Sequence, residues 1–209
     1  MDIIKKYYNL LINPVNFPFG KEVENIKINK EMDPITITKT FRKTKMDKYI
    51  KAIYLSNKLK KYNFIPKLIK FNDNKLELEQ IYCGSQATIS TLPNNWKEQL
   101  SKIKHQLIKE KVSFIDWGPW DVNPFVINNL CINNEKIYLI DLGDCEFTDS
   151  IYIEQYFDLQ IYYIEQLVKN NRLFIMYFYI INIFKGVYRK ISRLNNWIYF
   201  IILYIAYHL

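Results

Sequence analysis

The side chains best suited to catalysis lie in two short stretches of the C-terminal half of the chain. Asp116, Asp121 and Asn123 belong to a loop rich in Trp, Gly, Pro and Asp. Asp141 directly follows the apolar run 137–140. Carboxylates gathered in a small volume repel one another unless a cation such as Mg²⁺ lies between them. Oxygen ligands of this kind beside a basic side chain are what phosphoryl transfer requires.

A predicted β-hairpin would bring the two stretches together. Residues 125–127 and 137–140 are short apolar runs joined by an Asn-rich turn, which is typical of paired strands. Pairing these strands places the loop before the first strand and the residue after the second at one edge of the sheet. We therefore expect the carboxylates of Asp116 and Asp141 to converge on a shared divalent cation.

The surrounding pattern predicts two unlike halves. Alternating or short apolar runs indicate strands, and amphipathic spacing indicates helices. The expected strands are 23–28, 35–41, 67–71, 76–82, 125–127 and 137–140, and the expected helices are 47–62, 96–111 and the chain after about residue 151. A break at Gly84 separates a strand-rich half from a mostly helical one. The expected fold class is therefore α+β.

Composition limits the class of protein. The chain has 209 residues, of which 49% are hydrophobic, so it suits one domain or one domain with a tail, and not a disordered protein. The formal charge of +8 favours an anionic partner without choosing among nucleotide, nucleic acid, phospholipid and acidic glycan. Three scattered cysteines and two histidines argue against a zinc site and a Ser-His-Asp triad.

The order of these segments resembles that of protein-kinase-like enzymes. The likeness extends over about residues 35–193 and includes the strand that carries the nucleotide lysine, the hinge between lobes, the catalytic loop and the metal-binding segment. The matching segments, in chain order, are 38–41, 64–69, 76–81 with Gly84, 114–116, 121–123, 125–127 and 139–143. Within this superfamily the sequence is most similar to the bacterial lipopolysaccharide core heptose kinases, because residues 149–157 and an aromatic, basic tail also match.

The resemblance implies a reduced two-lobed fold. Residues 1–84 would form a truncated, β-rich N-lobe with one helix and the nucleotide lysine. Residues 85–172 would form the mostly helical catalytic C-lobe, and residues 173–209 an aromatic, basic helical tail. The implied activity is ATP-dependent transfer of a phosphoryl group to a heptose-like sugar hydroxyl of the lipopolysaccharide core.

The resemblance also implies roles for single residues. Asp116 would orient the sugar hydroxyl and accept its proton, and Asp141 would bind Mg²⁺ at the phosphates of ATP. Lys39 would hold the α- and β-phosphates. The second metal ligand is Asp121 or Asn123, and the pattern leaves that choice open.

Departures from the family pattern keep alternatives open. No glycine-rich loop precedes the lysine strand, and helix 47–62 contains no Glu to pair with Lys39. Lys43 is a rival for the role of Lys39. These gaps favour, as the second hypothesis, a non-catalytic kinase-like binding module. A nucleic-acid binder ranks last, because the lysines are spread and not clustered with aromatic residues.

Several neighbouring residues have structural explanations that compete with functional ones. We expect Trp117 and Trp120 to be packing residues that stiffen the catalytic loop. We expect Asp144 and Glu146 to be surface acids. Neither pair is therefore assigned to the chemistry.

The C-terminal tail has three interpretations. The apolar runs 173–184 and 197–209 are each shorter than the roughly 20 residues that span a bilayer. They suit core helices, a protein-binding surface or an interfacial anchor, the last because basic residues flank them. No secretory signal is recognised. The expected location is cytoplasmic, at the inner face of the membrane, where ATP and a lipid-linked glycan are the partners.

Overall fold

The computed structural model describes residues 22–114, 116–119 and 123–180. The chain divides into two compact units, Met1–Asn171 and Arg172–Leu209. In the second unit residues 172–180 are helical. The rest of the predicted tail lies outside the described residues, as do Asp121 and Trp120.

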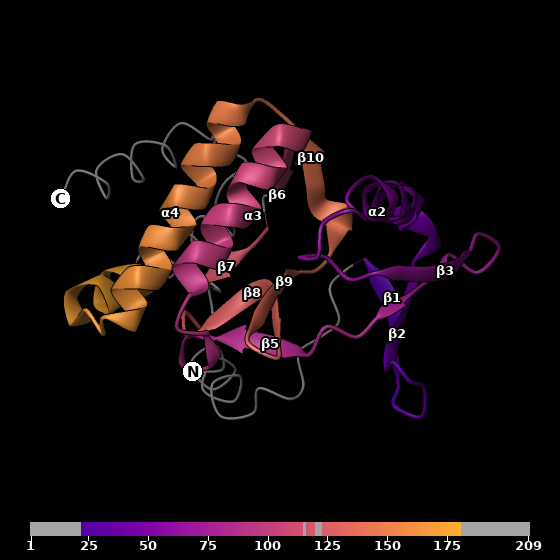
Figure 1. Ribbon diagram of the computed structural model, residues 1–209, viewed down its shortest axis with the longest axis horizontal. Coiled ribbons are helices and arrows are strands. Elements are labelled where there is room, and N and C mark those ends of the chain that lie inside the picture. The colour runs from indigo at the N-terminus through magenta and orange to yellow at the C-terminus, as the bar shows by residue number, and fades with distance from the viewer. Residues whose placement is uncertain (1–21, 115, 120–122, 181–209) are drawn as a thin grey trace, which may run out of the picture. The chain divides into compact units, whose positions relative to one another are not determined.

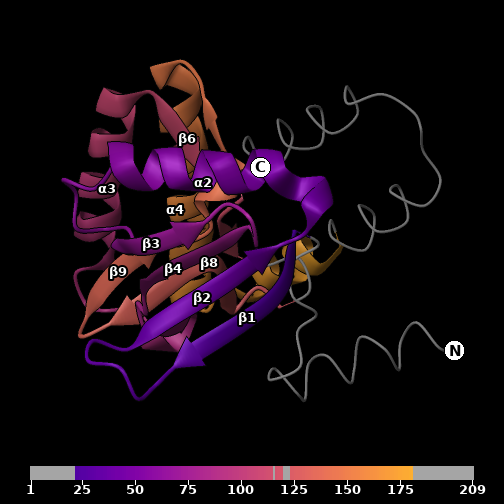
Figure 2. The ribbon, with the colours of Figure 1, turned by 90° about the vertical axis from the view of Figure 1, so that its right-hand side faces the viewer.

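The N-terminal part is an antiparallel sheet covered by one helix. The strands are β1 (Val23–Asn29), β2 (Thr36–Phe41), β3 (Leu68–Asn72) and β4 (Glu77–Ile81), in the order β1-β2-β4-β3. A 3-10 turn, η1 (Lys43–Lys45), leads into helix α2 (Met46–Lys58). Figure 2 shows α2 lying along one side of this sheet. The helix buries Tyr49, Ala52 and Leu55 there, which fits their helical spacing.

The C-terminal part combines two long helices with short strands. Helices α3 (Trp96–Glu110) and α4 (Ser150–Val168) lie side by side in Figure 1. The remaining elements are β5 (Ser85–Thr88), η2 (Ile89–Thr91), β6 (Val112–Phe114), β7 (Gly118–Pro119), β8 (Val126–Asn133), β9 (Lys136–Leu139), η3 (Leu142–Asp144) and β10 (Cys145–Phe147). Strand β8 lies between β5 and β7 and also pairs with β9, whereas β10 pairs with β6.

One hydrophobic cluster joins the two parts. It includes Phe41 and Leu55 from the N-terminal elements and Leu107, Leu139 and Phe157 from the C-terminal ones. All of these side chains are almost entirely buried. Burial of apolar surface on this scale fixes the loops between the elements, because the strand and helix ends from which they start are held in place.

The α+β class and the β-rich N-terminal region are confirmed. The predicted hairpin is present as β8 and β9, with Cys131 opposite Tyr138. The C-terminal half contains more strand than expected, because β5, β6, β7 and β10 are too short to show a two-residue period. The first helix ends at Lys58, before the predicted residue 62. Among the helices that the structure describes, none combines the length and apolarity required to cross a membrane.

Candidate active site

The β8–β9 hairpin sets the position of Asp141. The backbone N–H of Ile140 donates to the carbonyl of Asn129 at 3.0 Å, which holds the chain against β8 just before Asp141. Asp141 itself adopts a left-handed conformation, with φ +69° and ψ +61°. This conformation costs a non-glycine residue roughly 1 kcal/mol, and Asp tolerates it better than most. It turns the chain sharply from the β9 end into η3.

Three carboxylates meet at this turn. Glu22, Asp141 and Asp144, here called the acidic trio, each place an oxygen within 4.8 Å of the others. Glu22 lies just before β1, and Asp144 ends η3. Burial raises the pKa of Glu22, and so do the negative charges of Asp144 and Asp141. Glu22 Oε2 is buried and accepts no hydrogen bond from the residues that the structure describes.

The trio fits a magnesium ion by its donor chemistry. Mg²⁺ prefers hard oxygen ligands and usually takes only one or two protein carboxylates. The trio supplies carboxylate oxygens from two separate elements, and Glu22 also carries a buried oxygen, Oε2, that accepts no hydrogen bond from the described part of the chain. A cation would remove both the mutual repulsion and the unpaired oxygen.

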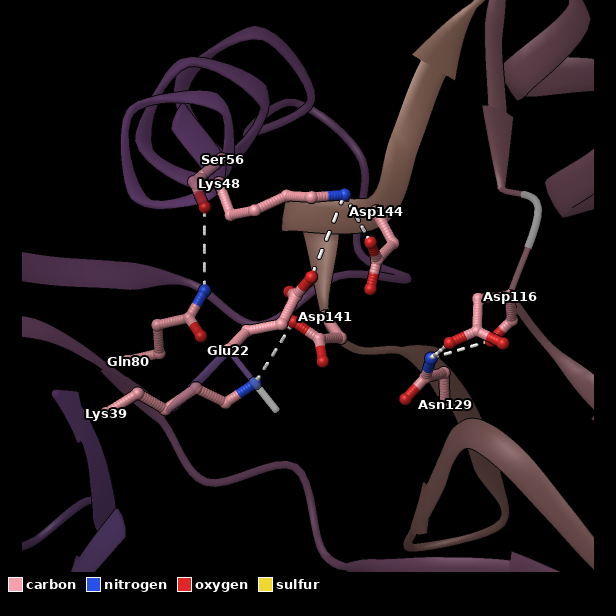
Figure 3. A network of polar contacts seen from close by, with 9 residues as sticks. All are labelled: Glu22, Lys39, Lys48, Ser56, Gln80, Asp116, Asn129, Asp141 and Asp144. Carbon is pink, nitrogen blue, oxygen red and sulfur yellow. Dashed lines mark hydrogen bonds and ion pairs between the residues drawn. The ribbon is translucent and has the colours of Figure 1, made fainter. Parts of the chain in front are cut away.

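Two lysines from the N-terminal elements point at the trio, as Figure 3 shows. Lys39 on β2 is only 9% exposed, and its Nζ lies 3.8 Å from Asp141 Oδ1. Lys48 on α2 donates to Asp144 Oδ1, and its Nζ lies 3.7 Å from Glu22 Oε1. The hydrogen bond to Asp144 is the main cause that raises the pKa of Lys48. Lys43 is exposed on η1, so of the two candidates for the nucleotide role it is Lys39 that reaches the trio.

Asp116 lies beside the trio and not within it. Its neighbours are neutral amides: Asn129 Nδ2 donates to the carbonyl of Asp116 at 2.6 Å and to its Oδ2 at 3.4 Å. Asn128 Nδ2 reaches Asp116 Oδ1 at 3.4 Å. Partial desolvation raises the pKa of Asp116, and the charges of Asp144 and Asp141 raise it further. Figure 3 shows the Asp116 carboxylate in the same region as Asp141 and Asp144, which agrees with the influence of their charges on its pKa.

Helix α4 supports the loop that carries Asp116. Trp117 is buried and packs against Phe157, with ring centroids 4.6 Å apart. The hydroxyl of Tyr156 donates to the Trp117 carbonyl at 3.2 Å. Gly118 has φ +123°, a conformation that side chains rarely adopt, and Gln160 fills the space where its Cβ would stand. Trp117 is therefore a packing residue, as predicted.

The predicted second metal ligands have different outcomes. Asp121 lies outside the described residues. Asn123 uses its Oδ1 to accept a hydrogen bond from the Phe125 N–H at 3.1 Å, so its carboxamide caps its own turn. The metal roles of Asp121 and Asn123 stay predictions.

Three charged residues of the site were not predicted. Asp144, expected to be a surface acid, is instead a member of the trio, whereas Glu146 is exposed. A local pattern could have revealed Asp144, because it follows Asp141 by three positions and residues three apart lie on one face of a 3-10 turn. Glu22 and Lys48 have no such pattern, since their partners are distant in sequence; Lys48 and Asp144 are 96 positions apart.

A cavity of about 470 Å³ lies elsewhere on the molecule. Its lining includes Ser56 and Lys60 near the end of α2, Tyr82 and Cys83 after β4, and Tyr138 on β9. No member of the trio lines it, and neither do Lys39, Lys48 and Asp116. The charged site is therefore separate from this cavity.

Comparison with known proteins identifies the fold. No protein-family model and no curated protein matches the sequence. Among 68 matching chains of solved structures is Rio2 kinase from Chaetomium thermophilum, in an ADP/Mg²⁺–phosphoaspartate complex, with a TM-score of 0.51 at 15% identity. The match covers 75% of this chain and 55% of that one, so this chain spans little more than half of the kinase. The likeness shows the fold alone and does not extend to the heptose kinases. The chain has an α+β fold that resembles part of a protein-kinase fold.

Proposed function

We propose that the protein is an ATP-dependent phosphotransferase that acts on an alcohol group. The observation that carries the proposal is the pairing of Lys39 Nζ with Asp141 Oδ1 at 3.8 Å within a kinase-like fold. A lysine from a strand of the N-terminal sheet and an aspartate after the hairpin are the groups that kinases use on the phosphates and on the metal. Here β2 and the β9–η3 turn bring them together.

The acidic trio and Lys39 would divide the binding of Mg²⁺–ATP. Asp141 and Asp144 offer the one or two carboxylates that Mg²⁺ usually takes, and Glu22 adds an oxygen, Oε2, that accepts no hydrogen bond from the residues the structure describes. Mg²⁺ would neutralise charge on the phosphate oxygens. Lys39 lies on β2 with little exposure. Its ammonium group is positioned to donate a hydrogen bond to a phosphate oxygen in place of its ion pair with Asp141.

Asp116 is the proposed group for the acceptor hydroxyl. A carboxylate that orients a hydroxyl and accepts its proton works best when its pKa lies closer to the working pH than that of a free Asp. The raised pKa of Asp116 is in the required direction. The amides of Asn128 and Asn129 leave Asp116 Oδ1 and Oδ2 with further acceptor capacity, because a carboxylate has about four lone-pair positions.

For the acceptor we propose a heptose-like sugar hydroxyl of the lipopolysaccharide core, on a lipid-linked glycan at the inner face of the cytoplasmic membrane. Its support is the sequence resemblance, which includes residues 149–157. In the structure this segment begins α4 and contributes Tyr156 and Phe157, which support the loop of Asp116. The charge of +8 also favours an anionic acceptor or membrane surface.

The experiment is ADP release by the purified protein with Mg²⁺–ATP. We expect release that depends on a dephosphorylated lipopolysaccharide core and is absent with sugar-free phospholipid vesicles. ADP release with simple alcohols but with no core oligosaccharide would contradict the acceptor and leave the phosphotransferase intact. No ADP release with any acceptor would contradict the enzyme proposal.

The second candidate is a non-catalytic nucleotide-binding module. The observation in its favour is that α2 supplies Lys48 to the site and no carboxylate, so the usual helix partner of Lys39 is missing. Such a module would be stabilised by Mg²⁺–ATP in a thermal-shift measurement and would release no ADP.

A further inference from the structure

Lys48 is the basic residue among the three of the site that the kinase pattern does not explain. Helix α2 directs its side chain at two members of the acidic trio, Glu22 and Asp144, as Figure 3 shows. The third member, Asp141, is paired with Lys39 instead. Each carboxylate of the trio thus has an ammonium group within 4 Å, and the ammonium group of α2 serves two of them.

Close packing fixes Lys48 in this position. Gly143 lies between Asp141 and Asp144, and a Cβ added there would stand 3.3 Å from both the Cβ and the carbonyl oxygen of Lys48. The backbone of α2 therefore contacts η3 directly. The Lys48 side chain is only 22% exposed, so its charge is screened less than that of a surface lysine.

The charge of Lys48 has opposite effects on the trio and on a metal ion. Without Lys48, Lys39 is the one ammonium group within 4 Å of the three carboxylates among the residues that the structure describes. Repulsion among the carboxylates would then rise, and their geometry would be less well fixed. A divalent cation at the same oxygens would be repelled by the Lys48 ammonium and must compete with it for Glu22 and Asp144.

We propose that Lys48 is a positioning residue that acts as the trio's resident counter-cation. Its ammonium group holds Glu22 and Asp144 in place in the metal-free protein and yields them when Mg²⁺ binds. This inference rests on the proposed function, because it takes the trio as the magnesium site. Lys48 thereby lowers the affinity for the bare metal ion while keeping its ligands assembled.

The test is a titration with Mn²⁺ alone, without nucleotide, in which electron paramagnetic resonance reports the free ion. We expect Lys48→Met to bind Mn²⁺ roughly tenfold more tightly than the wild type, because a positive charge close to the ion is removed. Lys48→Arg keeps the charge and should bind within about twofold of the wild type. The matched control is Lys58→Met, because Lys58 lies on the same helix as Lys48. This substitution removes an ion pair of 3.8 Å with Glu110 of α3, outside the trio.

A second measurement uses the wild-type protein and needs no substitution. Brief acetylation followed by mass spectrometry compares the labelling of Lys48 and Lys58, whose side chains are 22% and 29% exposed. We expect Mn²⁺ to raise the labelling of Lys48 several-fold and to leave that of Lys58 unchanged, because only Lys48 is released by the metal.

The outcomes separate the inference from the proposed function. If Asp141→Asn weakens Mn²⁺ binding but Lys48→Met binds no more tightly than the wild type, the inference is wrong and the metal site stands. Labelling of Lys48 that does not rise with Mn²⁺ would contradict the inference in the same way. If the wild type and Asp141→Asn bind Mn²⁺ equally or not at all, the proposed function and the inference fall together.

Discussion

The two sides of the candidate site balance their negative charge in different ways. On one side the acidic trio is compensated by full positive charges, the ammonium groups of Lys39 and Lys48. On the other side Asp116 is compensated by neutral amides, those of Asn128 and Asn129. Ammonium groups can be replaced by another cation, whereas amides can only shift the pKa of the carboxylate and orient it.

This difference suggests a division of labour. The ammonium-compensated side is suited to bind a charged ligand, because a metal ion or a phosphate can exchange with the lysines. The amide-compensated side is suited to proton transfer, because amide hydrogen bonds oppose only part of the rise in the pKa of Asp116. Substitutions on the two sides should therefore affect binding and chemistry separately.

The largest effect is expected for Asp141→Asn. Removing this charge should abolish both ADP release and the stabilisation by Mg²⁺–ATP, which for the wild type should be about 5 °C in Tm at saturating ligand. Differential scanning fluorimetry with and without Mg²⁺–ATP measures it. Asp158→Asn is the control, because Asp158 is 54% exposed and pairs with Lys104 on α3. If Asp141→Asn kept the full thermal shift, the trio would not be the part of the site that binds Mg²⁺–ATP.

Asp116→Asn should separate chemistry from binding. We expect kcat to fall by roughly 10²–10⁴-fold, because the proton acceptor is lost. The thermal shift with Mg²⁺–ATP should remain, because Asp116 is not a member of the trio. Steady-state ADP release together with fluorimetry checks both statements. Loss of the thermal shift would show that the two sides do not act separately.

Sequence reasoning identified the parts of the site that local pattern determines. Asp141 follows a strand that alternates between buried and partly buried residues, and Lys39 lies on another short strand. The resemblance to protein-kinase-like enzymes assigned Lys39 to the phosphates and Asp141 to the metal, and the structure places Lys39 Nζ 3.8 Å from Asp141 Oδ1. Trp117 was expected to be a packing residue that stiffens the catalytic loop, and the structure buries it.

The remaining parts depend on tertiary packing. Lys48 reaches the site because Tyr49, Ala52 and Leu55 fix the face of α2 that turns toward the core. In a lysine-rich chain, one lysine of that helix cannot be distinguished from the others by sequence. Glu22 comes before the first strand and has no periodic neighbours. Its place in the trio follows only from where β1 pairs with β2.

The third prediction concerns the amide of Asn129 and its effect on the pKa of Asp116. Asn129 has φ +53°, a left-handed conformation that glycine adopts freely, so Asn129→Gly removes the carboxamide with little backbone strain. The amides of Asn128 and Asn129 lower the pKa of Asp116 and partly offset its rise. Losing one of them should raise that pKa further. Because the deprotonated form is the active one, the acidic limb of the pH–kcat profile should move to higher pH.

The expected displacement is small, because the Asn129 Nδ2–Asp116 Oδ2 distance of 3.4 Å is long for a hydrogen bond to a charged group. The matched control is Asn134→Gly, since Asn134 has φ +48° in the β8–β9 turn and makes no hydrogen bond to Asp116. An acidic limb that stays in place, or moves equally in both variants, would show that the amides do not tune Asp116.

The smallest expected effect is a change in stability at Glu79, a carboxylate outside the site whose main charged partner is a single ammonium group. Glu79 on β4 accepts hydrogen bonds from Lys70 at 3.1 Å and from Thr36 at 2.9 Å. These bonds, that from Lys70 first, lower the pKa of Glu79. Glu22 also has an ammonium partner, Lys48, yet its pKa is raised by burial and by its acidic neighbours. Burial and crowding with like charges therefore explain the opposite signs.

Glu79→Gln should lower the free energy of unfolding by about 1 kcal/mol at pH 7, a modest loss because Lys70 is mostly exposed. Since the folded pKa of Glu79 lies below its unfolded value of about 4.3, this contribution is present above that value. It is lost as the pH falls through the folded pKa. Urea unfolding at pH 7 and pH 3 measures the change, with Glu77→Gln on the same strand as control. A destabilisation that persists unchanged at pH 3 would mean that the ammonium pairing with Lys70 is not its cause.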